Sequence, residues 1–170
     1  GPVKIFRLRA GELIAWNAPV AVSDSVAGGI RTMAISDLAG WWNSVTTADL
    51  DGDGRLDMVA GNRGLNGSWP ASAEFPARLF HGDLNGLGGV EMIESYHDAR
   101  AGIVPRRDLV QLATVLPWLR AEFLTHADFG GADVSRLLGS RGLRAQELRV
   151  TTPSSMVFFN RGDHFEAVPL

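Results

Sequence analysis

The chain has 170 residues, of which 45% are hydrophobic, and a formal net charge of −3. This length suits one domain with a buried core, and the charge disfavours nucleic acid or an anionic membrane as a partner. The absence of cysteine excludes disulfides and cysteine-ligated zinc. The sequence shows no signal peptide and predicts no membrane insertion, and Gly1-Pro2 is interpreted as the remnant of a cleaved expression tag.

The first forty residues alternate between apolar and polar side chains. Residues 3–16 predict an antiparallel hairpin that turns at Ala10-Gly11, and the alternation continues over 20–26 and 30–38. Short strands separated by Asn, Asp and Gly turns are typical of all-β sandwiches and propellers. Trp41-Trp42 follows, which we expect to pack between blades; a stacking platform for a sugar is the alternative.

The segment 44–62 concentrates acidic side chains in one short loop. Two carboxylates about 5 Å apart at an effective dielectric of ~20 repel each other by roughly 3 kcal/mol, so the loop favours a bound cation. Calcium takes about six to eight oxygen ligands at flexible angles, and Gly54 permits the sharp turn that lets them converge. The predicted cofactor is therefore Ca²⁺. The candidate ligands are Asp49, Asp51, Asp53, Arg55 and Asp57.

The spacing of these aspartates separates the loop from an EF-hand. An EF-hand needs a glutamate at position 12 of the loop, where this chain has Ala60. In this chain the fourth carboxylate is at position 9, just before an expected strand. The pattern D-x-D-x-D-G-x-x-D resembles the calcium loop of FG-GAP/VCBS repeats, which form blades of integrin-alpha-like β-propellers. The sequence segments 40–44, 60–66 and 104–108 resemble those of a subgroup of secreted VCBS proteins related to cartilage acidic protein. The resemblance implies that the loop joins two strands of one blade.

A copy of this loop begins 34 residues later, which indicates an internal duplication. Leu87 stands where the fifth position needs an oxygen ligand. Two interpretations therefore stay open: a weak second metal site, or a turn that has lost its ion, which we favour. The candidate residues of the second site are Asp83, Asn85, Gly89 and Glu91.

After a linker at 66–76 with Trp69 as its anchor, the pattern becomes helical. Asp108 is positioned to cap an amphipathic helix that continues to Leu116, and Pro117 interrupts it. Asp133 is positioned to cap a second helix. Further helix is expected at 118–123, 134–138 and 142–148, and strands are expected to return at 148–152, 156–160 and 165–168.

The predicted fold is mainly β: about two to three blades of an incomplete β-propeller, with an α-helical insertion. The blades and both loops occupy residues 3–98. The helical insertion occupies 99–147, and the returning blade strands occupy 148–170.

Other motifs have plain structural interpretations. Arg161-Gly162-Asp163 matches a tripeptide known to bind integrins, but Asn-Arg-Gly-Asp also suits a hairpin turn, which is the interpretation we adopt. Arg106-Arg107 is interpreted as a solvated face rather than an anion site. The four histidines share no metal-ligand spacing and are interpreted as solvated: His81, His97, His126 and His164.

The sequence predicts a calcium-binding, non-enzymatic module of a secreted or cell-surface protein, with an unknown protein or carbohydrate partner. An extracellular, cell-surface or periplasmic location is expected, because weak calcium sites stay filled only where calcium is plentiful. One alternative is a calcium-dependent polysaccharide lyase or hydrolase, although no catalytic residue is identified. Another is a homo-oligomer: two or three blades do not close a propeller, so either the helical segment covers the open edges or copies associate into a closed ring.

Overall fold

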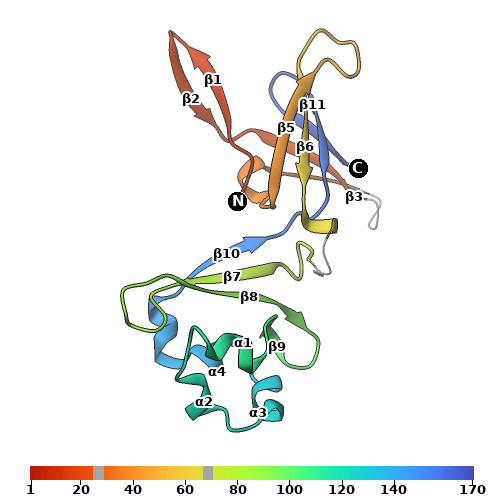
Figure 1. The fold of residues 1–170 in the computed structure, drawn as a ribbon. Coiled ribbons are helices and arrows are strands. Elements are labelled where there is room, and N and C mark those ends of the chain that lie inside the picture. Colours follow the sequence, from red (N-terminus) through yellow and green to blue (C-terminus); the bar gives the residue numbers. More distant parts are fainter. Residues whose placement is uncertain (25–28, 67–70) are drawn as a thin grey trace. The chain divides into compact units, whose positions relative to one another are not determined.

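The computed structural model describes residues 1–24, 29–66 and 71–170 (Figure 1). Trp69, the expected anchor of the linker, and the end of the strand expected at 20–26 lie outside these residues. The chain forms two compact units: unit 1 is Gly1–Ser68 with Val150–Leu170, and unit 2 is Trp69–Arg149. In the described ranges, no helix is long and apolar enough to cross a membrane.

Unit 1 consists of a hairpin and a six-stranded sheet with the order β4-β3-β12-β11-β6-β5. The sheet is antiparallel except for the parallel pair β12 and β3. The elements of unit 1 are β1 (Ile5–Arg9), β2 (Glu12–Trp16), β3 (Pro19–Asp24), β4 (Gly29–Ala34), η1 (Ile35–Asp37), β5 (Trp42–Ala48), β6 (Asp57–Asn62), η2 (Gly64–Asn66), β11 (Met156–Asn160) and β12 (Phe165–Pro169).

The hairpin predicted at 3–16 is confirmed: β1 pairs with β2, and both Ala10 and Gly11 have positive φ at the turn. The strand expected at 30–38 is shorter, because the Asp37 carboxylate accepts a hydrogen bond from the Ala34 amide and starts a 3-10 turn. The prediction of a mainly β chain is confirmed. A blade typically has four strands, so a six-stranded sheet with a parallel pair leaves the number of blades a prediction.

The core of unit 1 is built around Phe158 of β11, which is fully buried. Its ring contacts Trp42 and Phe165 edge to face, with centroids 6.3 and 6.5 Å apart. The indole of Trp42 also donates a hydrogen bond to the Leu38 carbonyl at 3.1 Å. Trp42 therefore packs against the core of unit 1, which agrees with the expectation that this residue has a packing role.

Unit 2 contains a four-stranded sheet, in which β8 pairs antiparallel with both β7 and β9, and a set of short helices. The strand order is β10-β7-β8-β9. The elements are β7 (Ala77–Gly82), β8 (Glu91–Asp98), β9 (Gly102–Pro105), α1 (Leu109–Ala113), α2 (Leu119–Glu122), α3 (His126–Gly130), α4 (Val134–Leu138), η3 (Gly139–Arg144) and β10 (Gln146–Val150).

Two predicted helix starts are confirmed. Asp108 accepts a hydrogen bond from the Gln111 amide, and Asp133 accepts one from the Arg136 amide, each at 2.8 Å. The helix expected at 142–148 is wrong: the 3-10 segment ends at Arg144 and the chain enters β10, which lies next to β7 in the sheet. The helix α3 was not predicted.

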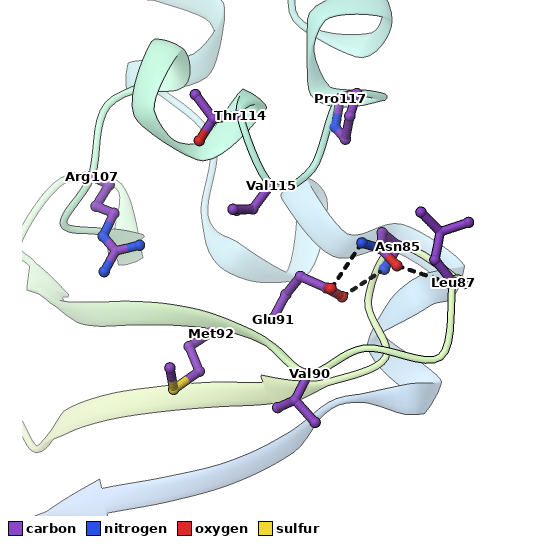
Figure 2. A pocket seen from close by; sticks show the side chains of 9 residues that line it. All are labelled: Asn85, Leu87, Val90, Glu91, Met92, Arg107, Thr114, Val115 and Pro117. Carbon is purple, nitrogen blue, oxygen red and sulfur yellow. Dashed lines mark hydrogen bonds between the residues drawn. The ribbon is translucent and has the colours of Figure 1, made fainter.

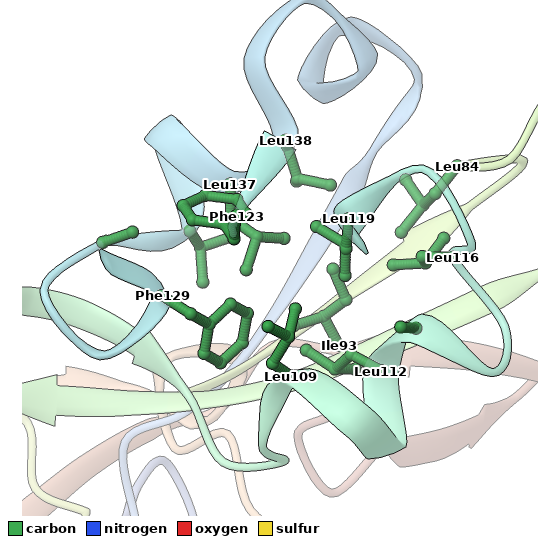
Figure 3. Close-up of a cluster of buried hydrophobic side chains, with 13 residues drawn as sticks. Leu84, Ile93, Leu109, Leu112, Leu116, Leu119, Phe123, Phe129, Leu137 and Leu138 are labelled. Atoms are coloured by element: carbon green, nitrogen blue, oxygen red, sulfur yellow. The ribbon is translucent and has the colours of Figure 1, made fainter. Parts of the chain in front are cut away.

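The helices of unit 2 have only four or five residues, too few to be stable in isolation. They are stabilised by packing around one apolar cluster (Figure 3). Its members are Leu84, Ile93, Leu109, Leu112, Ala113, Leu116, Leu119, Phe123, Phe129, Ala132, Val134, Leu137 and Leu138. The cluster includes Leu84 from the second loop, so the helical segment and that loop share one core.

Replacing Phe158 with alanine should destabilise unit 1 by about 3–5 kcal/mol, because it leaves a cavity beneath the sheet. The matched control is Ile30→Ala in the same unit, where the side chain is 75% exposed and little change is expected. Urea titration followed by NMR reads the two units separately. Equal destabilisation by both variants would contradict the assignment of Phe158 as the centre of this core.

Candidate metal centre

The first acidic loop connects the antiparallel strands β5 and β6, which pair from Trp42 with Asn62 to Ala48 with Asp57. Two glycines turn the backbone, Gly52 with φ +78° and Gly54 with φ +82°, a region that L side chains rarely adopt. The loop is therefore shaped by its glycines and fixed at both ends by strand pairing.

Asp49 stabilises the turn from inside. One of its carboxylate oxygens accepts hydrogen bonds from the amides of Gly52 and Asp53, at 2.8 and 3.1 Å, and the other accepts one from Gly54 at 3.0 Å. Three successive amides thus point at one carboxylate. This holds Asp49 on the inner side of the loop.

Asp57 joins the loop to the sheet. Its side chain is fully buried, and its two oxygens accept hydrogen bonds from the amides of Leu50 and Asn160, each at 2.8 Å. The amide of Asn160 is the main cause that lowers the pKa of Asp57, followed in the same direction by that of Leu50, while burial acts in the opposite direction. The carboxylate is therefore held in its ionised form.

Asp49, Asp51 and Asp57 bring carboxylate oxygens within 4.8 Å of one another. Such a set of oxygen ligands fits a hard cation. The other two predicted ligands have different partners. Asp53 forms an ion pair with Arg55 at 2.7 Å, and Nε of Arg55 donates to the Asn160 carbonyl at 2.8 Å.

The sequence did not identify Arg161 as part of this site. Its Nη1 donates to Oδ2 of Asp51 and lies 3.4 Å from Oδ2 of Asp53, and its Nε donates to Glu166 at 2.9 Å. The hydrogen bond to Asp51 is the main cause that raises the pKa of Arg161. The predicted hairpin turn at this position is confirmed by the pairing of β11 with β12, but its arginine contacts the acidic loop.

The second loop repeats the backbone of the first. Gly86 and Gly88 have φ of +78° and +81°, which match the corresponding values in the first loop. Glu91 accepts a hydrogen bond from the Leu84 amide at 2.9 Å, as Asp57 does from Leu50. The duplication seen in the sequence is therefore also a duplication of local structure.

The interior of the second loop differs from that of the first. The side-chain amide of Asn85 donates to Glu91 at 2.8 Å, a donor that Asp51 cannot provide (Figure 2). Leu84 is fully buried, whereas Leu50 in the first loop is 48% exposed. Among the described residues, acidic and histidine side chains converge as a group of three in the first loop only. The second metal site therefore stays a prediction, and in this structure Asn85 is bonded to Glu91.

The remaining polar candidates have local partners. His97 stacks on Phe75 with ring centroids 4.3 Å apart, and His164 lies 2.7 Å from the carboxylate of Asp163. The Arg107 guanidinium lies 3.7 Å from Glu94. In the described part of the chain these residues form no metal-binding cluster.

The pKa shift of Asp57 predicts an acid-sensitive unit 1. Because its pKa is below the ordinary value of 3.8, the ionised group stabilises the fold above that pH, and this contribution is lost as the pH falls further. Asp57→Asn should lower the melting temperature at pH 7 and flatten the acid dependence, as thermal melts from pH 2 to 7 would show. The control Glu12→Gln changes an exposed carboxyl of β2 and should leave the neutral melt nearly unchanged.

Comparison with known families supports one part of the chain. Residues 41–68, which include the first loop and both of its strands, match the FG-GAP repeat. No curated protein and no solved structure gives a significant match. The match does not support the expected membership of the subgroup related to cartilage acidic protein. The segment that carries the acidic loop is therefore similar to an FG-GAP repeat.

Proposed function

We propose that the chain is a calcium-binding, non-enzymatic interaction module of a secreted or cell-surface protein. The observation that carries this proposal is the convergence of Asp49, Asp51 and Asp57 within a segment that matches the FG-GAP repeat. These three residues would hold the ion, and its charge would offset the repulsion between their carboxylates. The expected role is structural, because a cation that binds only the folded loop stabilises the fold.

The protonation state of the loop supports this role over glycan cleavage. A general acid must carry a proton near neutral pH, but the lowered pKa of Asp57 keeps that carboxylate ionised. Asp49 accepts three backbone hydrogen bonds that hold its carboxylate in the turn. These carboxylates are arranged as acceptors, which suits ion binding.

The proposed location follows from the proposed ion. FG-GAP repeats occur in extracellular and cell-surface proteins. Much of the proposed site is exposed, since Asp49 and Asp51 both face solvent and only Asp57 is buried. Solvated sites of this kind need abundant calcium to stay filled, which supports an extracellular, cell-surface or periplasmic setting.

Calcium should raise the melting temperature of the chain. At a concentration about 100 times the dissociation constant, binding adds about 2.7 kcal/mol, or roughly 5–10 °C for a chain of this length. Excess chelator should remove the gain, and Asp51→Asn should abolish it. The control Asp83→Asn changes an aspartate of the second loop, at the position that corresponds to Asp49, and should keep it. A melt that does not respond to calcium would contradict the proposal.

A second observation favours association between copies of the chain. Phe6, Leu8 and Leu13 lie on one face of the β1–β2 hairpin, because Leu8 pairs with Leu13 and alternate residues share a face. Their side chains are 52%, 70% and 70% exposed. Exposed apolar groups of this kind mark interaction sites. We propose that this face contributes to a homo-oligomer.

Charge on that face should prevent association. Leu8→Glu combined with Leu13→Glu places like charges directly opposite each other on the hairpin and removes its apolar surface. Sedimentation velocity should show an oligomer for the parent chain and a monomer for the double variant. A parent chain that is monomeric at every concentration would refute this assembly and leave the calcium proposal intact.

A further inference from the structure

We propose that Arg161 sets the metal affinity of the first loop by acting as an exchangeable internal cation. This inference rests on the proposed binding of calcium. The guanidinium neutralises Asp51 and Asp53, and a divalent cation bound to Asp51 would compete with it for that carboxylate. The residue would therefore stabilise the loop by itself and weaken the binding of the ion.

Both oxygens of Asp51 are already engaged. Oδ1 accepts a hydrogen bond from the Asp53 amide at 3.3 Å, and Oδ2 accepts one from Arg161. A guanidinium and a divalent cation on one carboxylate repel each other. Of the two bonds, the one to Arg161 is the one that a cation would replace, because the Asp53 amide belongs to the loop backbone.

Arg161 has other partners that would keep it in place after the exchange. Its Nε donates to Glu166 on β12 at 2.9 Å, and its guanidinium lies 5.4 Å from the ring of Phe159. Its side chain is 28% exposed, so it can move without opening the core. The hydrogen bond from the Asn160 amide to the Asp57 carboxylate, which joins the first loop to the β11–β12 turn, does not involve Arg161.

A comparison of the two loops explains why the first loop takes a positive charge from another segment of the chain. In the second loop, Asn85 donates to Glu91 from within the loop, and this donor cannot leave. Asp51 stands at the same position and has no donor. The first loop therefore takes its positive charge from a turn 110 residues away in sequence. A donor supplied from another segment can be displaced.

The charge balance leaves room for a divalent ion. The four aspartates of the loop and Glu166 face only two arginines, Arg55 and Arg161, so the group carries a formal excess of three negative charges. Arg161 offsets part of the repulsion between the carboxylates of the loop. A divalent cation offsets more, and Arg161 remains paired with Glu166.

The test compares Arg161→Gln with the parent chain by calcium titration calorimetry and by thermal melts in chelator. The variant should bind calcium more tightly, by about fivefold or more, because the competing charge is gone. It should also melt at a lower temperature without calcium. Arg149→Gln is the control: it removes an ion pair with Glu147 in β10 and should leave the calcium affinity unchanged.

The outcomes separate the two proposals. Unchanged or weaker calcium binding by Arg161→Gln, with binding by the parent intact, overturns the exchange and leaves the calcium site standing. Failure of the parent chain itself to bind calcium overturns the proposed function and the exchange with it. If the variant does not fold, NMR of the Arg161 guanidinium in the parent chain decides: a signal that stays fixed on calcium saturation refutes the exchange.

Discussion

The buried carboxylate of Asp57 is the contact on which the arrangement of unit 1 around the acidic loop depends. An ionised group buried in protein is costly unless it is fully hydrogen-bonded, and Asp57 receives one backbone amide on each oxygen. One amide, from Leu50, belongs to the loop, and the other, from Asn160, belongs to the end of β11. The loop and the β11–β12 turn are therefore held together, which places Arg161 beside Asp51.

The two copies of the loop keep their shape by different means. The first has Leu50 half exposed and carboxylates that face each other, so it depends on positive charge brought from outside. The second has Leu84 buried among the helices of unit 2 and an internal bond from Asn85 to Glu91. Hydrophobic burial and one side-chain amide thus stabilise the second loop, whereas the first loop has ion pairs with Arg55 and Arg161.

Local patterns in the sequence were enough for the elements that depend on neighbouring residues. The hairpin at Ala10-Gly11 and the helix caps Asp108 and Asp133 follow from turn and capping chemistry, and the structure has them. Asp49 and Asp51 come together in the glycine turn as their spacing implies, and Asp57 joins them from the first residue of β6, whereas Asp53, at the next alternate position, pairs with Arg55.

Contacts between distant segments could not be read in the same way. Arg161 reaches the loop only because β11 pairs with β6, from Met156 with Ala60 to Phe158 with Met58. No periodicity in the sequence specifies that pairing or the parallel pairing of β12 with β3. The expected helix at 142–148 failed for a related reason: β10 lies beside β7 in the sheet, and this long-range pairing overrides local helix propensity.

The matching positive-φ glycines of the two loops have an evolutionary consequence. Because Gly52 and Gly54 have nearly the same φ angles as Gly86 and Gly88, the chain makes the same turn in both loops although their side chains differ. Substitutions between these glycines can therefore change the charge of a loop while the strands stay in register. A lineage built from such repeats can alter the charge of one loop at a time.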